Sequence, residues 1–342
     1  MTQGWLLVET LGGQPAVVAQ GRQMKNFVPL AGFLRRNPNL SAIQTAITET
    51  VASGQPLSSI TPKTHRVIRT EPVVMSDGRI HAVQVWCGPP DTEPPERPIP
   101  GPLLWDLTAG EATGTVQYLI NAGMDPATEP TEGRTFIDDV PSRSLNHDEA
   151  KVLAQAVDAA PDRTYCATWN FIDKQGQFRR VGFAVRTAME TMADGSDHLI
   201  ARAMNLVDSV QSTPPPTERL AERILGGLAE PGVYRLLVDL NNWTPLKWLD
   251  EPCPYFVWRA GAQLHPEDQK LYSARMADEL LTGSTSAVLR MPGEDGAWVP
   301  LHVSISRMEL DAGVYAGLVT LRLPTGDELA EFHRTATTDG VH

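Results

Sequence analysis

The chain has 342 residues with 41 acidic and 29 basic side chains, and its formal net charge is −12. This length suggests two or three domains, and an apolar share of 42% is enough to bury several small cores, which excludes a chain that is disordered throughout. The negative charge argues against a nucleic-acid-binding surface and against a polybasic membrane anchor.

The first 87 residues predict a small antiparallel sheet with a helix. Trp5–Glu9 reads as a short apolar strand that ends on an acidic residue. Ile43, Ile47 and Val51 recur at helical spacing and predict one buried stripe. Asp77-Gly78 lies between alternating apolar runs, which is a strong hairpin signal because the tight turn requires a positive φ.

Two proline-rich breaks divide the chain. Residues 88–100 contain six prolines, and because proline lacks an amide donor and fixes φ, they predict a semi-stiff extended linker. The second break is Ser212–Pro216. These breaks predict domains at 1–87, 101–211 and 217–326, with the linker at 88–100 and a flexible tail at 327–342.

The middle segment repeats the order of elements seen in the first. Leu103–Leu107 is its opening strand, and Gln175-Gly176 marks a weaker hairpin turn. Acidic residues that follow Asn146 predict the start of a helix. The buried face of that helix is expected from Val152, Leu153, Ala156, Val157 and Ala160.

The third segment repeats the same order again. Tyr234–Leu240 is the opening strand, Leu264–Asp268 places a proline at a first helical position, and Glu294–Ala297 contains the hairpin turn. Leu271 and Met276 are expected to face inward from the helix. One face of the closing strand is expected from Val299, Leu301, Val303 and Ile305.

Three segments with one layout indicate a divergent repeat. A strand pair, then helices, then a three-stranded meander predicts an antiparallel sheet with helices on one face, which is an α+β module. Thr217–Leu228 reads as an amphipathic helix just before the third module. We expect it to pack on its own domain; the alternative is that it pairs two subunits.

The third segment resembles a PAS domain. The resemblance rests on Val238-Asp239-Leu240, Leu246–Leu249, Leu264–Asp268 and Asp295–Val299. The middle segment is PAS-like more loosely, and the first is similar to PAS or GAF domains by its layout. The resemblance therefore implies three consecutive PAS/GAF-like domains.

Taken whole, the chain resembles a mycobacterial, hence actinobacterial, family of three-domain proteins with a GAF-like N-terminal domain and two PAS-like domains. Gly4–Thr10 and Phe33–Pro38 belong to this resemblance. It implies a role in sensing or signalling, and a link with cholesterol utilisation.

No signature of a known enzyme class is present. The chain lacks a Walker loop, a GxGxxG after a strand, GxSxG, HExxH and the kinase motif set. Cys87, Cys166 and Cys253 form no metal, disulfide or flavin-attachment pattern, and they read as reduced thiols. His65 and His81 are expected on neighbouring strands of one hairpin, without a third metal ligand. We expect no cofactor and no metal, with the other histidines solvated or shaping a helix entry.

Aromatic side chains are the best candidates for a ligand pocket. Apolar pockets with few polar groups are the default small-molecule sites, and the alternative is plain packing of a small sheet. The candidate pocket residues are Trp105, Tyr118, Tyr165, Trp169, Phe183, Trp248 and Trp298.

The sequence therefore predicts a cytoplasmic, non-enzymatic sensory or regulatory protein that binds a small molecule or a protein partner. The expected partners are an unidentified protein or an apolar, lipid-like molecule, without nucleic acid and without membrane insertion, and the expected state is a monomer or weak dimer. Two alternatives stay open: an interaction scaffold with no open pocket, and an enzyme of unrecognised type. The N-terminus shows no signal peptide, and no stretch is long and apolar enough for a membrane helix.

Overall fold

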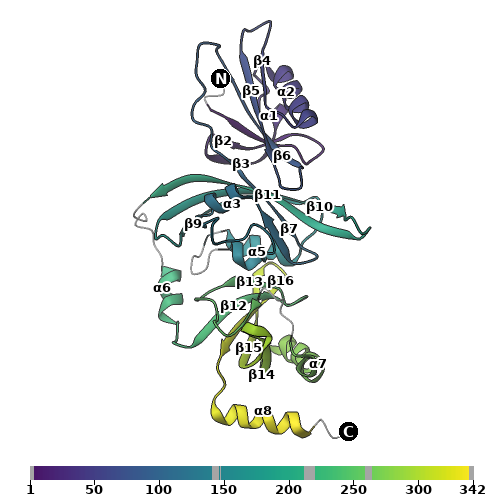
Figure 1. The fold of residues 1–342 in the computed structure, drawn as a ribbon, viewed down its shortest axis with the longest axis vertical. Helices are drawn as coiled ribbons and strands as arrows, with labels where there is room; N and C mark the ends of the chain where they lie inside the picture. The colour runs from purple at the N-terminus through teal and green to yellow at the C-terminus, as the bar shows by residue number, and fades with distance from the viewer. Residues whose placement is uncertain (1–3, 141–145, 147, 212–219, 259–263, 339–342) are drawn as a thin grey trace. The chain divides into compact units, whose positions relative to one another are not determined.

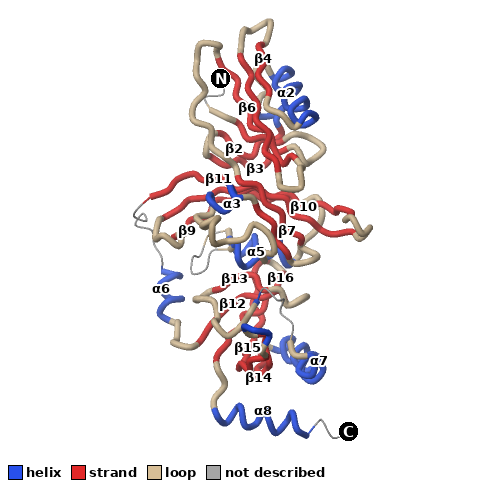
Figure 2. The backbone as a smooth tube through the Cα atoms, viewed as in Figure 1, coloured by secondary structure: helices blue, strands red, loops and turns tan. Residues whose placement is uncertain are grey.

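The computed structural model describes residues 4–140, 146, 148–211, 220–258 and 264–338. In this part of the chain, three antiparallel sheets follow one another along the sequence (Figures 1 and 2). The chain divides into two compact units, residues 1–134 with 159–217 and residues 135–158 with 218–342. The first unit holds two of the sheets, and we call residues 4–88 its N-terminal module and the second sheet with its helix its middle module. The second unit is called the C-terminal unit.

The N-terminal module is a six-stranded sheet covered by a helix. Its elements are β1 (Leu6–Glu9), β2 (Ala16–Gln20), β3 (Gln23–Pro29), α1 (Leu30–Phe33), α2 (Leu40–Ser53), β4 (Leu57–Ile60), β5 (Val67–Val74) and β6 (Ile80–Gly88), with strand order β3-β2-β1-β6-β5-β4. Ile43 and Ile47 of α2 are buried as predicted, but Val51 is 38% exposed, so its prediction was wrong. Thr50 is buried in its place, because 3.6 residues per turn return position i+7 to the starting face.

The middle and C-terminal sheets share one topology. The middle sheet contains β7 (Gly101–Asp106), β8 (Glu111–Gly114), β9 (Thr164–Ile172), β10 (Phe178–Thr191) and β11 (Asp197–Gln211), and α3 (Val116–Asn121) packs on β7 and β11. The C-terminal sheet contains β12 (Val233–Asp239), β13 (Pro245–Trp248), β14 (Ser284–Pro292), β15 (Trp298–Asp311) and β16 (Val314–Arg322). Their strand orders, β8-β7-β11-β10-β9 and β13-β12-β16-β15-β14, are the same order by position. The predicted α+β class and the repeated layout are confirmed.

The three predicted hairpin turns form where the glycines were expected. Gly78, Gly176 and Gly296 have φ of 82°, 77° and 72°, a backbone conformation that glycine adopts without steric cost. The third turn contains a short 3₁₀ helix, Glu294–Gly296. The hairpin signals therefore located the closing strands of all three sheets.

The helices between β8 and β9 belong to the C-terminal unit, which differs from the expectation that they cover their own sheet. They are α4 (Phe136–Asp139) and α5 (Glu149–Val157). α4 packs against β13, and α5 packs against β15 and β16. Ile137 joins the hydrophobic core of the C-terminal sheet. Their place in the sequence suggested that these helices cover the middle sheet. An amphipathic helix shows which of its own faces is buried, but not against which sheet it packs.

The remaining helices are α6 (Leu220–Gly227), α7 (Pro266–Thr282) and α8 (Gly326–Thr338). Met276 of α7 is buried as predicted, whereas Leu271 is 43% exposed. The expected flexible tail instead begins with α8, which buries Phe332 beneath the guanidinium of Arg290. The predicted break at Ser212–Pro216 lies outside the described residues.

The proline-rich segment is fastened to the N-terminal module. The indole Nε1 of Trp5 donates a hydrogen bond of 3.0 Å to the carbonyl of Pro95, and Nε2 of Gln84 donates one of 2.6 Å to the carbonyl of Pro98. Proline contributes only its carbonyl to such bonds. These bonds hold the linker against the N-terminal module.

Candidate functional site

A large cavity lies inside the C-terminal unit. Its volume is about 1060 Å³, near the upper end of the ~300–1,000 Å³ that is usual for small-molecule sites. Its inner wall consists of buried aliphatic side chains of the sheet and of α7, together with Phe256 from the segment between β13 and α7. These are Leu236, Val238, Phe256, Met276, Leu280, Leu289, Met291, Val303, Ile305, Val319 and Leu321.

The position of α7 over the sheet is fixed at its first turn. His265 caps the helix and Pro266 occupies its first turn, where a missing amide hydrogen costs nothing. Asp268, 2% exposed, accepts hydrogen bonds of 2.7 Å from both the backbone nitrogen and Nη2 of Arg290 on β14. This charge-assisted pairing holds the helix so that Met276 and Leu280 face the cavity.

The open end of the cavity is polar. It is formed by the turn between β12 and β13, by the hairpin between β15 and β16, and by the end of α5. The turn is held by Asp239, whose carbonyl accepts a hydrogen bond of 2.7 Å from the nitrogen of Trp243. Trp243 has a φ of 62° and is 36% exposed. Burial raises the pKa of Asp239, while hydrogen bonds from Asn241 and Asn242 oppose the shift.

One cation lies at this open end. Arg307 of β15 lines the cavity, and its guanidinium carbon lies 3.7 Å from the ring centroid of Tyr315 on β16. Such stacking of arginine on an aromatic face is favourable and keeps the guanidinium donors available. The cavity thus combines an apolar interior with a polar entrance that carries the guanidinium of Arg307 and the carboxylate of Asp158.

The structure brings three of the predicted site residues together in the middle module. Phe183 of β10 contacts Trp169 and Tyr165 of β9, at ring-centroid distances of 4.8 and 6.0 Å. Nε1 of Trp169 is buried without a hydrogen-bond partner among the described residues. Tyr118 belongs to a separate cluster with Leu103, and Trp105 packs against that cluster.

The other two predicted residues lie in the C-terminal unit but outside the cavity lining. Trp248 is 3% exposed and makes an edge-to-face contact of 5.5 Å with Trp258. Trp298 is 41% exposed and packs against the His265 ring. The cavity is lined mainly by aliphatic residues, and sequence reasoning assigned Val303 and Ile305 to a core face. The alternating pattern located that face but carries no sign that it borders empty space.

A second hollow, of about 770 Å³, lies in the first unit between the N-terminal module and the proline-rich segment. Trp86, Cys87 and Arg66 are among the residues that line it. Burial raises the pKa of the Cys87 thiol, and burial raises that of Cys166 to about 11. Both thiols are therefore protonated near neutral pH and are poor nucleophiles.

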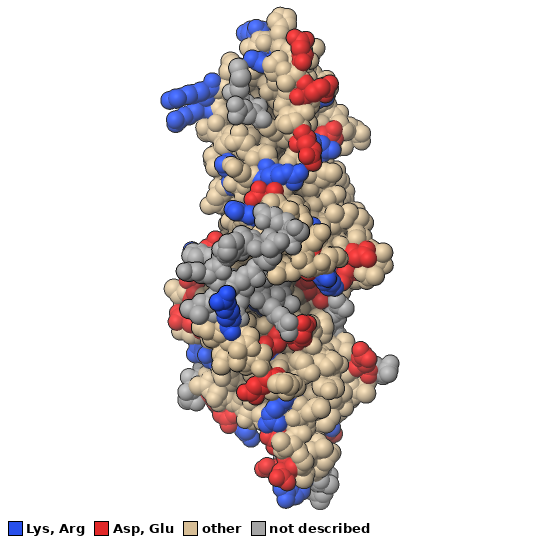
Figure 3. Space-filling model, turned by 90° about the vertical axis from the view of Figure 1, so that its left-hand side faces the viewer, with Lys and Arg blue, Asp and Glu red and all other residues tan. Residues whose placement is uncertain are grey.

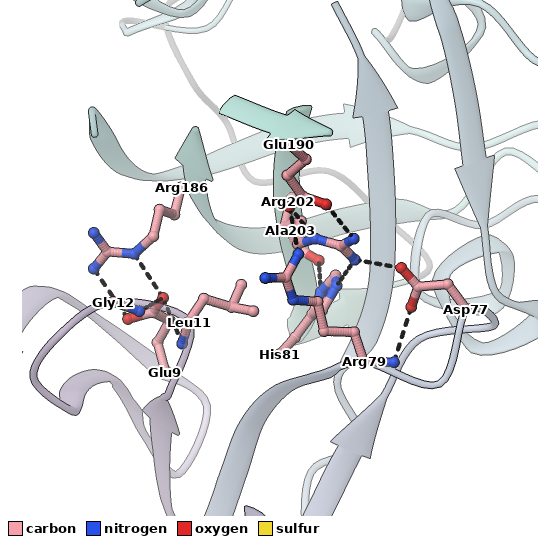
Figure 4. Close-up of polar contacts among 10 residues, drawn as sticks. All are labelled: Glu9, Leu11, Gly12, Asp77, Arg79, His81, Arg186, Glu190, Arg202 and Ala203. Atoms are coloured by element: carbon pink, nitrogen blue, oxygen red, sulfur yellow. Dashed lines mark hydrogen bonds and ion pairs between the residues drawn. The ribbon is translucent and has the colours of Figure 1, made fainter. Parts of the chain in front are cut away.

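The N-terminal and middle modules are joined by an apolar contact and by buried charges (Figure 4). Glu9 forms a two-point ion pair with Arg186. Arg202 of β11 pairs with Asp77 and Glu190, at 2.7 Å in each case, and contacts His81.

His81 was expected on a hairpin surface beside His65, but it is fully buried, and His65 lies in the turn before β5. His198 was expected to be solvated, but its Nδ1 lies 2.6 Å from Asp106.

The described side chains include no group of three or more histidine, cysteine or acidic residues that is arranged to hold a metal ion. Within the same residues, no helix is long and apolar enough to cross a membrane. Acidic and basic side chains are interspersed on the face drawn in Figure 3.

Comparison with known proteins finds relatives that match nearly the whole chain. Profiles of the Rv3651-like N-terminal, middle and C-terminal domains match residues 4–96, 99–208 and 218–332. The crystal structure of an uncharacterised protein from Mycobacterium tuberculosis is 54% identical, with a TM-score of 0.86, over 96% of this chain and 98% of that one. No curated protein matches the chain.

Two further solved structures are similar at a much lower level. A sensory box histidine kinase/response regulator from Burkholderia thailandensis E264 is 16% identical over 32% of this chain and 76% of that one, with a TM-score of 0.23. An RNA-binding light-oxygen-voltage receptor is 10% identical over 71% of this chain and 100% of that one, with a TM-score of 0.24. Likenesses of this size do not bear on function, and the assignment rests on the first relative. The chain belongs to the Rv3651-like family, whose three domains it spans in order.

Proposed function

We propose that this protein is a non-enzymatic sensor or regulator, built of PAS- and GAF-like modules, that binds an apolar small molecule in the cavity of its C-terminal unit. The cavity is the observation that carries the proposal. Side chains such as Leu289 and Leu321, each 1% exposed, border its volume of about 1060 Å³. The hollow opens to solvent at one end, and its size is that of small-molecule sites.

The chemistry of the lining favours an apolar occupant. Burial of apolar surface contributes about 25 cal/mol per Å², so a lipid-like molecule gains most of its affinity from this wall. The lipid or cholesterol context that the family resemblance implies agrees with such a ligand. The repeated strand order supports PAS-like modules, in which binding at one sheet is transmitted by rearrangement of attached segments.

The first experiment asks whether a molecule is bound. Native mass spectrometry of the purified full-length protein is expected to show an added mass that organic extraction removes. Titration of the extracted protein with an aliphatic ligand is expected to change the fluorescence of Trp243, which lies at the cavity entrance. Unchanged spectra with fatty, alkyl and sterol ligands would favour an interaction scaffold instead.

A pair of matched variants tests the cavity itself. Leu289 and Leu301 face each other across β14 and β15, and both are buried, but only Leu289 lines the cavity. Leu289→Phe is expected to fill space, keep stability and abolish ligand binding. Leu301→Phe is expected to cost about 1–3 kcal/mol by overpacking. Equal destabilisation by both changes in urea unfolding would mean that this region is solid core.

A further inference from the structure

We propose that the molecule bound in this cavity is an amphipathic carboxylate of the long-chain fatty acid class, with its head group held by Arg307 and its alkyl chain against the inner wall. This inference rests on the proposed function and adds the chemical class of the ligand. It is carried by the order of side chains along β15, by the guanidinium of Arg307 at the entrance, and by the partners of the nearby acidic residues.

The strand itself leads from the apolar wall to the cation. Val303, Ile305 and Arg307 alternate along β15 and therefore point to the same side of the sheet. All three line the cavity. Val303 and Ile305 are 4% and 2% exposed, whereas Arg307 is exposed. A ligand that extends along this strand meets methyl groups first and a guanidinium at the open end.

The backbone opposite Arg307 is covered by the apolar wall. Arg307 pairs across the ladder with Gly317 of β16, which has no side chain. A Cβ at that position would lie 2.8 Å from Leu240, 2.9 Å from Val238 and 3.2 Å from Ile305, all of which line the cavity. These side chains close over the glycine, so the apolar wall extends to the position opposite Arg307.

Arg307 forms no ion pair with an acidic side chain in the described part of the chain. Among the described residues that line the cavity, the charged ones are Arg307 and Asp158, and Asp158 has an interaction of its own within the chain. Glu309 and Asp311, on the same hairpin, accept hydrogen bonds from the nitrogens of Gly313 and Ala312. In the described part of the chain, Arg307 is stacked on Tyr315 and has no ion pair.

A carboxylate suits this position better than a neutral head. Arginine offers planar, paired donors that match a carboxylate in two-point fashion. The side chains of Asn241 and Asn242 already donate hydrogen bonds to Asp239. Arg307 is therefore the side chain at the entrance that can pair with a charged head group. A neutral alcohol of the same chain length gains the apolar contacts but not the charge-assisted bond.

The test compares dodecanoate with 1-dodecanol by isothermal titration calorimetry on the extracted full-length protein. The wild type is expected to bind the acid about tenfold more tightly than the alcohol. Arg307→Gln is expected to remove that difference by weakening acid binding alone, and Arg307→Lys to restore part of it. The acid affinity of the wild type is expected to fall with added salt, while the alcohol affinity does not.

Arg275→Gln is the matched control. Arg275 is also an exposed arginine over a tyrosine ring, that of Tyr272, but it lies outside the cavity lining. Its loss is expected to leave both affinities unchanged. Equal binding of acid and alcohol by the wild type, without salt dependence, would overturn the head-group proposal and leave the apolar site standing. Binding of neither probe would instead count against the proposed function, and unchanged acid binding in Arg307→Gln would exclude Arg307 as the contact.

Discussion

Nη1 of Arg202 on β11 donates a hydrogen bond of 3.2 Å to Nε2 of His81 on β6. Because arginine can only donate, Nε2 is the acceptor, and the ring proton sits on Nδ1, 3.2 Å from the carbonyl oxygen of Ala203. The imidazole is fully buried between the N-terminal and middle modules (Figure 4). The contact is therefore built for a neutral histidine, with Asp77 and Glu190 balancing the charge of Arg202.

This arrangement predicts a loss of stability in acid. Burial, together with the charge of Arg202, lowers the pKa of His81 from 6.5 to about 4. Between these values the unfolded chain binds a proton that the folded chain does not, so stability falls as the pH drops from 6.5 towards 4. The maximum contribution is roughly 3 kcal/mol, since each unit of pKa difference corresponds to ~1.4 kcal/mol.

Urea unfolding at pH 7.0, 5.5 and 4.5 measures this contribution. His81→Gln, which does not titrate, is expected to show a shallower loss of unfolding free energy over this range than the wild type. His65→Gln removes an exposed histidine and serves as the control. Its unfolding free energy is expected to change with pH as that of the wild type does. The same slope in His81→Gln and wild type would contradict a neutral buried imidazole.

Close packing of the two modules depends on Gly182 of β10. A Cβ there would lie 2.2 Å from Cγ of Met24 on β3. We expect Gly182→Val to cost about 1–3 kcal/mol by overpacking, and Met24→Ala in the same chain to recover part of that loss. Gly32→Ala, where no atom lies within 4 Å of the added carbon, is the control in thermal unfolding. A Gly182→Val variant as stable as the wild type would show that Met24 and the β3 backbone can shift to make room for the added side chain.

The ion pair between Glu9 and Arg186 is the second buried link between these modules. Glu9 is 1% exposed, and it accepts hydrogen bonds of 2.7 and 3.1 Å from Nε and Nη2 of Arg186. Glu9→Gln leaves the guanidinium without its counter-charge, and we expect a loss of about 3 kcal/mol in unfolding free energy. Glu96→Gln breaks an exposed pair with Arg22 and is expected to cost at most about 1 kcal/mol. Similar losses for both variants would contradict a role for burial.

Local patterns in the sequence predicted local structure well. Alternation along residues 299–305, the helix start at Pro266 and the glycine turns each depend on a few neighbouring residues, and each formed as expected. The repeated layout of a strand pair, helices and a meander predicted an antiparallel sheet in each segment, and all three sheets formed.

Features that depend on distant residues escaped prediction. His81 is a polar residue of β6, and it is buried by the middle sheet, where its ring contacts the carbonyl of Ala203 on β11. Residues so far apart in the sequence give no local signal of this contact. Val303 and Ile305 were assigned to one face of the closing strand, and nothing in their identity distinguishes a filled core from a cavity. The aromatic candidates Trp169 and Phe183 do meet, but the structure places the large cavity behind aliphatic residues of the C-terminal sheet.

The ion pair between Glu149 and Lys247 tests the assignment of α5 to the C-terminal unit. Lys247 of β13 is 1% exposed and pairs with Glu149 at the start of α5, which is 5% exposed. Loss of one partner from a buried pair typically costs about 3–5 kcal/mol, because the other charge stays buried. Glu149→Gln is therefore expected to destabilise the C-terminal unit, although in sequence Glu149 lies between strands of the middle sheet.

Hydrogen exchange followed by mass spectrometry separates the two units. In Glu149→Gln, peptides that cover α5 and β13 are expected to lose protection, while those that cover β10 and β11 keep it. Glu267→Gln, which removes an exposed partner of Arg290, is the control and should leave both units protected. Replacement of the pair by Glu149→Leu with Lys247→Met should recover stability, since an apolar pair of similar volume avoids the buried charges. Faster exchange in β10 and β11 than in β13 would assign α5 to the middle sheet instead.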